Sequence, residues 1–334
     1  MSVSFLHKYL DETRPGWAVA IARELDMVER TLETTICSDV PTAYDLSIGL
    51  LSAGGKRIRP ALVVLSALAS GEYDSQRMLG VAAAAELVHM ASLVHDDVVD
   101  ETRERRGART ANENWGNKIS VLGGDYLLSK AFQLLVANGG PDVLRALSAT
   151  AVRMTESEML QASAEGDLAL WEANYWRIIR DKTAHFLGAC CECGAYIGGA
   201  DPRTRDLLRE YGVQLGLAFQ ITDDVLDIAG DPAVTGKATG SDLTQGKYTL
   251  PVLLALRNSG DAASLRAMLM SGKLTRDEAE LVAAKVIECG AVDDARGVAV
   301  ECVDKAREQL REVVASDYAQ ALDALAGFVI GREA

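Results

Sequence analysis

The segment from Val81 to Asp100, VAAAAELVHMASLVHDDVVD, gives the clearest indication of the fold class. Its apolar residues recur at intervals of three and four, which is the spacing of one face of an α-helix. Ala, Leu and Glu, which have a high intrinsic helix propensity, are frequent in it. The stretch therefore predicts a long, largely apolar helix that carries acidic side chains near its end.

The rest of the chain has the same helical character. Its seven prolines, at positions 15, 41, 60, 141, 202, 232 and 251, leave the windows 61–140, 142–201 and 252–334 uninterrupted. Glycine-containing breaks at 138–141 and 198–202 are typical of helix ends. No run alternates with a two-residue period, and no Ser/Gly/Pro-rich linker divides the chain. We therefore expect an all-α fold with few or no strands, as a single domain over residues 1–334.

Composition excludes several classes of function. Of 334 residues, 49% are hydrophobic, which is enough for a substantial core, and 34 Lys+Arg against 48 Asp+Glu give a net charge of −14. Such an acidic chain is a poor candidate for binding nucleic acid or an anionic membrane surface. The longest stretches without a charge are 12 residues long, at 60–71 and 211–222. Since a spanning helix needs about 20 apolar residues, we expect no transmembrane segment. The charged N-terminal residues do not fit a secretory signal, so we expect a cytoplasmic protein.

The arrangement of the six cysteines is consistent with a cytoplasmic protein. Cys190, Cys191 and Cys193 cluster within HFLGACCECGA, and the others are isolated. Cys190 and Cys193 match C-x-x-C, but no second pair of ligands stands at zinc-site spacing. We therefore favour a helix of small residues packed in a core or lining a pocket over metal or redox chemistry.

Two aspartate motifs indicate the chemistry. Asp96, Asp97 and Asp100 form one D-D-x-x-D motif, and Asp223, Asp224 and Asp227 form another. With 26 aspartates in the chain, two such motifs arise by chance in roughly one chain in a hundred. Residues three and four apart share a helix face, so each motif gathers like charges that are destabilising unless a cation is present. Oxygen-rich sites completed by water and substrate phosphates suit Mg²⁺. A solvated acidic helix end explains one motif, but two within apolar helices favour metal binding.

Basic residues beside glycines supply the complement to these acids. They are Lys56, Arg57 and Arg59 after Gly54-Gly55, Arg105-Arg106 before Gly107, Lys182 before Thr183, Lys237 after Gly236, and Lys247 after Gly246. Arginine grips phosphate as a planar fork and lysine as a point charge, and glycine allows the backbone to approach closely. Any single lysine among them could serve solubility alone. Acids for Mg²⁺ and bases for phosphate together imply a bound diphosphate.

Helical-wheel geometry places these residues on two faces. His89, Ser92, Asp96 and Asp100 fall within about 80° of one another. Gln220, Asp223, Asp224 and Asp227 form the second face. If the two faces oppose each other across a helical bundle, their carboxylates share one cavity, which is where bundles usually build metal sites. His89 is either a substrate contact or a core histidine bonded to a neighbour.

With these motifs the sequence resembles the trans-isoprenyl diphosphate synthases, the chain-elongating prenyltransferases. The resemblance runs from about residue 50 to residue 251 and rests on two acidic motifs and on GGKRIRP at 54–60. The other matching blocks are ELVHMASLVHDDVVDETRERRG (86–107), GNKISVLGGDYLL (116–128), RDKTA (180–184), FQITDDVLDI (219–228) and GKATGSDLTQGKYTLP (236–251).

The resemblance implies an antiparallel α-helical bundle around a deep central cavity, usually a homodimer, with three Mg²⁺ ions. It assigns these ions to Asp96, Asp100 and Asp223, with Asp97, Asp224 and Asp227 adjacent. It implies an allylic diphosphate on Arg105, Lys182, Thr183, Gln220, Lys237 and Lys247. It implies isopentenyl diphosphate on Gly55, Lys56, Arg59, His89 and Arg106. No departure from the family pattern occurs at any of these positions.

Product length depends on the residues beneath the first acidic motif. One helical turn is about 5.4 Å, close to one isoprene unit, and the family stops early when the fourth or fifth residue before the motif is aromatic. Here these are Ser92 and Ala91, which are both small, and Val88 further down is not aromatic either. Phe132 is either a cavity floor or plain core. We expect a hexaprenyl to decaprenyl product, with geranylgeranyl as the runner-up.

Two other classes remain open. A terpene cyclase would use Asp-bound Mg²⁺ and an allylic diphosphate, but 5% aromatic residues suit its expected pocket poorly. A non-catalytic subunit of a heteromeric prenyltransferase should have lost some of the acids or grips, and this chain retains them.

Overall fold

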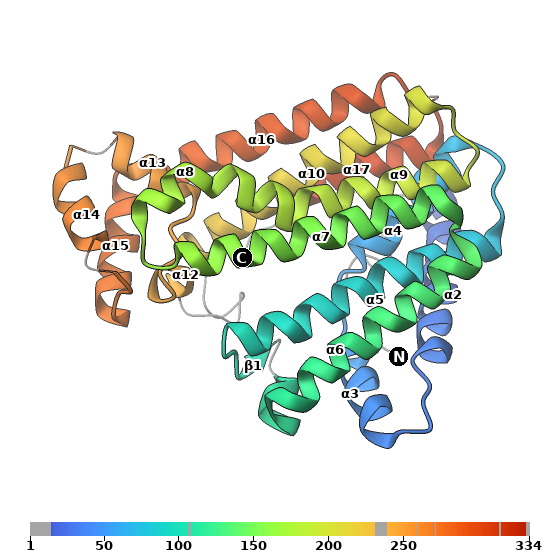
Figure 1. Cartoon of the computed structure of the whole chain (residues 1–334). Helices are drawn as coiled ribbons and strands as arrows, with labels where there is room; N and C mark the ends of the chain where they lie inside the picture. The colour runs from blue at the N-terminus through green and yellow to red at the C-terminus, as the bar shows by residue number, and fades with distance from the viewer. Residues whose placement is uncertain are drawn as a thin grey trace. The chain divides into compact units, whose positions relative to one another are not determined.

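A computed structural model of the chain describes residues 15–105, 108–230, 239–258, 260–270, 272–313 and 315–331 (Figure 1). Nearly all of these residues are helical. The only strands among them are β1 (Glu104–Arg105) and β2 (Ala108–Arg109), which pair antiparallel as a short hairpin. The predicted all-α class and the scarcity of strands are confirmed.

The helices follow one another with short connections. In the first part of the chain they are α2 (Pro15–Thr35), α3 (Pro41–Ser52), α4 (Ile58–Ser70), α5 (Ser75–Val99), α6 (Ala111–Asn138) and α7 (Gly140–Ala164). They continue as α8 (Leu168–Ile179), the π-helical turn η1 (Arg180–Ala184), α9 (His185–Ile197), α10 (Pro202–Ala229), α12 (Ser241–Thr244), α13 (Leu250–Asn258), α14 (Ala262–Leu269), α15 (Arg276–Glu288), α16 (Ala291–Leu310) and α17 (Asp317–Ile330).

Prolines and glycines set the helix boundaries as expected. Six of the seven prolines lie within the first three residues of a helix, where a missing N–H costs no hydrogen bond; Pro232 lies outside the described residues. The predicted breaks at 138–141 and 198–202 are confirmed as the α6–α7 and α9–α10 boundaries.

The chain divides into two compact units. The first contains the chain up to Ala149 together with Ala189–Arg209 and Arg311–Leu322. The second contains Thr150–Gly188, Glu210–Leu310 and the chain from Asp323 onward. Our expectation of a single domain stays a prediction.

Helix α5 lies at the centre of the first unit, where it packs against α2, α4 and α6. Asp74 caps its start by accepting a hydrogen bond from the backbone N–H of Arg77 at 3.1 Å. The four alanines from Ala82 to Ala85 are fully buried. A helix that is apolar on most sides packs inside a protein, and this burial fixes the place of the acidic motif at the end of α5.

The cysteine cluster lies on α9, which packs closely against α4. Cys190, Cys191 and Cys193 are all buried, and the cysteines of the described chain are all free thiols. Burial raises the pKa of all three thiols, that of Cys191 to about 12. A Cβ atom on Gly194 would lie 2.2 Å from the Val63 carbonyl oxygen of α4. Small residues are thus needed for packing, and the structural interpretation of the cluster is confirmed.

Helices α5 and α6 are each long and apolar enough to span a membrane by length and composition. The most apolar window of α5 is 72% buried, as in the core helix of a soluble protein, but that of α6 is only 33% buried. The length of the stretches without a charge did not reveal either helix, because isolated charges interrupt each of them. The expected absence of a transmembrane segment is therefore not confirmed.

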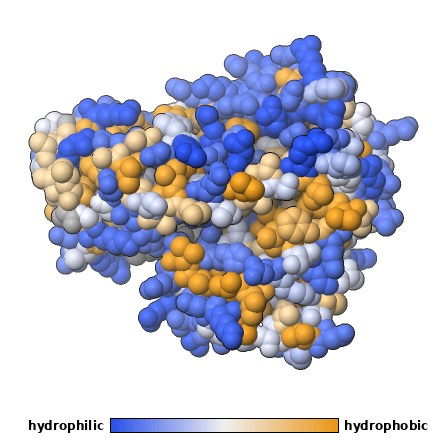
Figure 2. Space-filling view, in the orientation of Figure 1, coloured by the Kyte–Doolittle hydropathy of each residue, from blue (hydrophilic) through white to orange (hydrophobic). Residues whose placement is uncertain are grey.

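An apolar strip remains exposed on α6. It consists of Val121, Leu122, Phe132 and Val136, whose exposed fractions are 42%, 55%, 39% and 74%. Figure 2 shows hydrophobic side chains gathered over α6 in the lower half of the view. Exposed apolar surface of this kind usually marks an interaction site.

Candidate active site

The first acidic motif lies at the C-terminal end of α5, in the first unit. Its aspartates differ in exposure, because Asp97 is buried while Asp96 and Asp100 are half-buried. Asp100 ends the helix, and its backbone N–H donates to the Asp96 carbonyl oxygen at 2.8 Å. Since residues four apart share one side of a helix, Asp96 and Asp100 offer two accessible carboxylates at the helix end.

Asp97 instead holds the β1–β2 hairpin. Both Nε and Nη2 of Arg105, on β1, donate to Asp97 Oδ1, at 2.9 and 2.8 Å. The side-chain amide of Asn112 donates to the Asp97 carbonyl oxygen at 3.2 Å. We predicted Arg105 as a grip on the allylic diphosphate, and this ion pair was not foreseen. The diphosphate contact of Arg105 stays a prediction.

The second acidic motif, on α10 in the second unit, repeats the same division. Asp224 is 2% exposed, while Asp223 and Asp227 are half-buried. The Tyr175 hydroxyl donates to Asp224 Oδ2 at 2.6 Å, and the Gln220 amide donates to Asp224 Oδ1 at 3.1 Å. In both motifs the middle acid is therefore a buried structural partner, and the outer acids are the accessible ones.

Electrostatics reinforce that division at Asp224. Burial raises the pKa of its carboxyl well above the usual range, and the donors Tyr175 and Gln220 oppose this shift only in part. Burial likewise raises the pKa of the Tyr175 phenol, so the phenol stays protonated and can donate. Asp224 is thus fixed by hydrogen bonds in a poorly solvated position.

A π-helical turn joins this network to the predicted phosphate grips. The turn η1 interrupts the helical path between α8 and α9 and carries Lys182 and Thr183. The Thr183 hydroxyl donates to Gln220 Oε1 at 2.9 Å, and Gln220 in turn bonds Asp224. Such turns occur frequently at functional sites. Thr183 and Gln220, both predicted site residues, are therefore brought together with the second acidic motif.

Replacing Tyr175 by phenylalanine should destabilise the second unit. The change leaves a buried carboxyl without one of its donors, which costs about 1–3 kcal/mol of unfolding free energy. Chemical denaturation measures this loss, and turnover should fall with it because Asp224 is no longer fixed. The exposed Tyr44 offers a control, since Tyr44→Phe should leave both quantities unchanged. Wild-type stability and turnover in Tyr175→Phe would contradict the role of this hydrogen bond.

The cations of GGKRIRP lie at the junction of α3 and α4, in the first unit. Lys56 is in the turn, Arg57 is the N-cap of α4, and Arg59 is in the first turn of that helix. Gly54 has a φ of 75°, a conformation that favours glycine. Lys56 and Arg59 are half-buried, and so is His89 on α5. Of the residues predicted for isopentenyl diphosphate, Gly55, Lys56, Arg59 and His89 thus belong to one unit; Arg106 lies outside the described residues.

Two lysines predicted for the allylic diphosphate lie in the second unit. Lys247 is 8% exposed and follows Gly246, whose carbonyl accepts a hydrogen bond from the Gly166 N–H at 2.9 Å. Lys182 forms an ion pair with Glu158 at 2.5 Å, a partner not foreseen from the sequence. Lys237 lies outside the described residues.

The outer acids suit Mg²⁺. No three carboxylate, imidazole or thiol groups of the described residues converge on a common point. Mg²⁺ does not require this, because it keeps several waters and binds one or two carboxylates together with substrate phosphates. The accessible pairs Asp96–Asp100 and Asp223–Asp227 supply hard oxygen ligands of that kind. Each of these pairs, within its own unit, therefore fits a magnesium ion that also binds a diphosphate.

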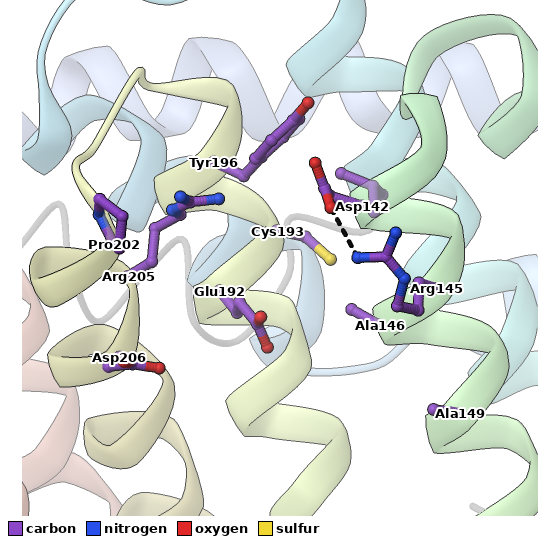
Figure 3. A pocket seen from close by; sticks show the side chains of 11 residues that line it. Asp142, Arg145, Ala146, Ala149, Glu192, Cys193, Tyr196, Pro202, Arg205 and Asp206 are labelled. Atoms are coloured by element: carbon purple, nitrogen blue, oxygen red, sulfur yellow. Dashed lines mark hydrogen bonds and ion pairs between the residues drawn. The ribbon is translucent and has the colours of Figure 1, made fainter.

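A cavity of about 430 Å³ in the first unit is a different feature (Figure 3). It lies among the first turns of α7, the C-terminal half of α9 and the start of α10. Its charged lining residues are Asp142, Arg145, Glu192, Arg205 and Asp206, and Arg145 already bonds Asp142 at 2.7 Å. Two cations against three acids give no grip on a diphosphate. This cavity is therefore not the predicted central one, which stays a prediction.

The residues predicted to set product length fall into two groups. Val88 and Ala91 are buried, and Ser92 is half-buried with its hydroxyl donating to the His89 carbonyl oxygen at 2.9 Å. Phe132 instead belongs to the exposed apolar strip of α6. An exposed side chain does not form an enclosed floor, so the structure does not support Phe132 as one.

Comparison with known proteins identifies the family of the chain. A family model described as polyprenyl synthetase matches residues 41–287. The chain belongs to the polyprenyl synthetase family. It is 37% identical over 314 residues to octaprenyl diphosphate synthase of Escherichia coli, covering 93% of this chain and 97% of that protein. It is 35% identical over 310 residues to heptaprenyl diphosphate synthase component 2 of Bacillus subtilis, covering 93% and 88%.

A solved structure supports the same family fold. The polyprenyl synthase of Caulobacter crescentus, complexed with calcium and isoprenyl diphosphate, matches with a TM-score of 0.88 at 35% identity over the full length of both chains. The resemblance to trans-isoprenyl diphosphate synthases and the isoprenoid-synthase type of all-α fold are confirmed.

Two residues that contact predicted site residues were missed from the sequence. They are Glu158, which pairs with Lys182, and Tyr175, which donates to Asp224. Arg57 was named among the basic residues of GGKRIRP, but its pairing with Glu86 was not foreseen. Glu158 and Tyr175 lie in ordinary helical sequence, and no local signal distinguishes them.

Proposed function

We propose that the chain is a catalytically active, Mg²⁺-dependent trans-prenyltransferase. It joins isopentenyl diphosphate to an allylic diphosphate and makes an all-trans product from hexaprenyl to decaprenyl. The observation that carries this proposal is the repeated acidic motif with one buried middle acid and two accessible outer acids. Family relatives named for heptaprenyl and octaprenyl products support the medium to long chain length.

The metal ligands are the accessible acids. Asp96 and Asp100 on α5 and Asp223 on α10 hold Mg²⁺, with Asp227 alongside, and the family resemblance favours three ions. When bound, Mg²⁺ supplies positive charge that stabilises the departing diphosphate. A solved relative that contains calcium and isoprenyl diphosphate supports a divalent cation in this site.

The cations of the chain bind and orient the two substrates. Lys182, Lys247, Lys237 and Arg105 hold the allylic diphosphate while its C–O bond breaks, and Lys56, Arg59, His89 and Arg106 hold isopentenyl diphosphate with Gly55. The alkene then attacks the allylic cation, and a proton passes to the released diphosphate. Fixed positive charge and close orientation of the two substrates lower the barrier without a protein nucleophile.

The decisive experiment is product analysis with purified chain, Mg²⁺, labelled isopentenyl diphosphate and farnesyl diphosphate. Chromatography of the dephosphorylated products should show chains longer than geranylgeranyl. A geranylgeranyl product would keep the reaction class and reject the chain-length assignment. Folded protein that incorporates no label from any primer would reject the proposed activity.

Replacing Ser92 by phenylalanine should shorten the product by at least one isoprene unit. Ser92 lies one turn, about 5.4 Å, before Asp96, so an aromatic ring there occupies space into which the growing tail would extend. The same chromatographic assay measures the product distribution. Val300→Phe, at an exposed position of α16, is the matched control and should leave the distribution unchanged. An unaltered product from Ser92→Phe would contradict this assignment.

The chain forms a homodimer through the exposed strip of α6. Val121, Leu122, Phe132 and Val136 recur on one side of this helix, and burying them against a second copy removes apolar surface from water. A dimer also explains why α6 is so little buried. Sedimentation at micromolar concentration tests this, and a monomer would contradict it.

We further propose a single-domain, cytoplasmic enzyme that does not bind nucleic acid, consistent with its net charge of −14.

A second candidate function follows from the Bacillus subtilis relative, which is named as one component of its synthase. In that case the chain would need a second polypeptide, either as the catalytic member or as a partner subunit. Activity of the chain alone separates these possibilities. Product formed from an allylic diphosphate without isopentenyl diphosphate would instead indicate a terpene cyclase.

A further inference from the structure

The middle cation of GGKRIRP points into the protein. Arg57 is 7% exposed, whereas its neighbours Lys56 and Arg59 are half-buried. Its Nη1 donates to Glu86 Oε1 at 2.9 Å, and its Nη2 donates to Glu29 Oε2 at 3.2 Å and to the Leu51 carbonyl oxygen at 3.1 Å. Its Nε also donates to Glu29. Four of its five N–H groups are therefore used inside the unit.

Arg57 also adopts an unusual backbone conformation. Its φ is 50° and its ψ is 33°, in the left-handed region, where a residue with a Cβ atom is strained. Such strain persists only where surrounding contacts fix the residue. Here Arg57 is the N-cap of α4, so the same residue sets both the entry into α4 and the direction of the preceding turn.

The partners of Arg57 come from three helices. Glu29 is on α2, Leu51 is on α3, and Glu86 is on α5, one turn before His89. Glu86 is 4% exposed, so Arg57 is its charged partner in a poorly solvated place. A buried ion pair adds little net stability but strongly fixes geometry, because losing one partner leaves an uncompensated charge. The guanidinium therefore ties the GGKRIRP turn to the helix that carries His89.

We infer that Arg57 is a positioning residue that fixes the turn carrying Lys56 and the first turn of α4, which carries Arg59. Both residues thereby present their charges to the diphosphate of isopentenyl diphosphate. This inference rests on the proposed function for those two neighbours. Arg57 itself does not grip the substrate, because its donors are directed at Glu29, Glu86 and Leu51. Its loss displaces the groups that bind isopentenyl diphosphate and spares Lys182 and Lys247, the allylic grips of the second unit.

The test is a comparison of Arg57→Ala and Arg57→Lys with the unmodified chain. In Arg57→Ala the KM for isopentenyl diphosphate and its Kd from calorimetry should rise about 10- to 100-fold, since small displacements of a binding group have effects of this size. The KM for farnesyl diphosphate should change by less than about twofold. Arg57→Lys keeps the positive charge but loses the planar guanidinium with its several N–H donors. Its KM and Kd for isopentenyl diphosphate should therefore lie between those of Arg57→Ala and the unmodified chain.

Arg77→Ala is the matched control for general destabilisation. Arg77 is another partly buried arginine of the first unit, and it donates to the carbonyl oxygens of Asn138 and Gly139 at 3.0 and 3.2 Å. This variant should lower the melting temperature without raising the KM for isopentenyl diphosphate. If Arg57→Ala does not fold, Glu86→Gln weakens the same clamp, and its KM for isopentenyl diphosphate should rise about 3- to 10-fold.

The outcomes separate this inference from the proposed function. An unmodified chain that neither binds nor incorporates isopentenyl diphosphate would overturn both. An active unmodified chain, with folded Arg57→Ala or Glu86→Gln that binds isopentenyl diphosphate normally, would overturn this inference alone. Equal increases in the KM of both substrates would also overturn it, because they indicate a general disturbance.

Discussion

Replacing Asp96 by alanine should lower kcat by at least about a thousandfold, and Asp223→Ala should do the same. Each change removes an accessible carboxylate from an acidic motif and leaves the buried middle acid with its partners. Mg²⁺, whose charge would stabilise the leaving diphosphate, is then bound less tightly, while the hydrogen bonds of Asp97 and Asp224 remain. Steady-state incorporation of labelled isopentenyl diphosphate at saturating Mg²⁺ measures the loss.

The chain contains its own control for this experiment. Asp293 and Asp294 form an acidic pair at the start of α16, but position 297 is Gly, so the third acid is missing. Asp293 lies at the surface and bonds Arg296 at 3.0 Å. Asp293→Ala should therefore retain full activity. A correctly folded Asp96→Ala or Asp223→Ala variant with more than about a tenth of normal turnover would refute the metal assignment.

Replacing Gly194 by alanine should cost about 3 kcal/mol of unfolding free energy, because overpacking of a tight core has effects of this size. The added Cβ would lie 2.2 Å from the Val63 carbonyl oxygen and 2.9 Å from Ser66 Cβ. Backbone cannot rotate away as a flexible side chain would, so α9 must move off α4. Urea denaturation followed by circular dichroism measures the change.

Gly297 provides the opposite case for the same substitution. It lies in α16, and a Cβ atom there would meet nothing within 4 Å. Gly297→Ala should therefore be neutral or stabilising by up to about 1 kcal/mol, the difference in helix propensity between the two residues. Equal effects at Gly194 and Gly297 would show that close packing of α9 on α4 is unimportant.

Local sequence signals predicted much of the fold and the chemistry. Periodicity and the placement of prolines and glycines gave the helices and their boundaries, because these signals act within a few residues. The two acidic motifs and the GGKRIRP block were equally readable, since each is contiguous. Gln220 and Thr183 were both predicted as site residues, and the structure joins them by a hydrogen bond.

Contacts between distant residues could not be predicted in the same way. Tyr175 and Asp224 are 49 positions apart, and nothing around Tyr175 distinguishes it from a core tyrosine. The division of each motif into buried and accessible acids likewise depends on what packs against the helix. Phe132 stays a prediction for a related reason, because the helical pattern of α6 does not show which of its faces the rest of the protein covers.

The buried thiols of α9 can be used to measure local opening of the structure, through the rate at which they are alkylated. Alkylating reagents attack thiolates, and the raised pKa and burial of Cys190, Cys191 and Cys193 suppress this attack in the native state. The labelling rate of Cys191, which lies against Ser66 of α4, therefore measures how often α9 separates from α4, in the manner of hydrogen exchange. Mass spectrometry can follow that rate in the working enzyme, so a substrate that stabilises the packing of α9 on α4 should slow the labelling.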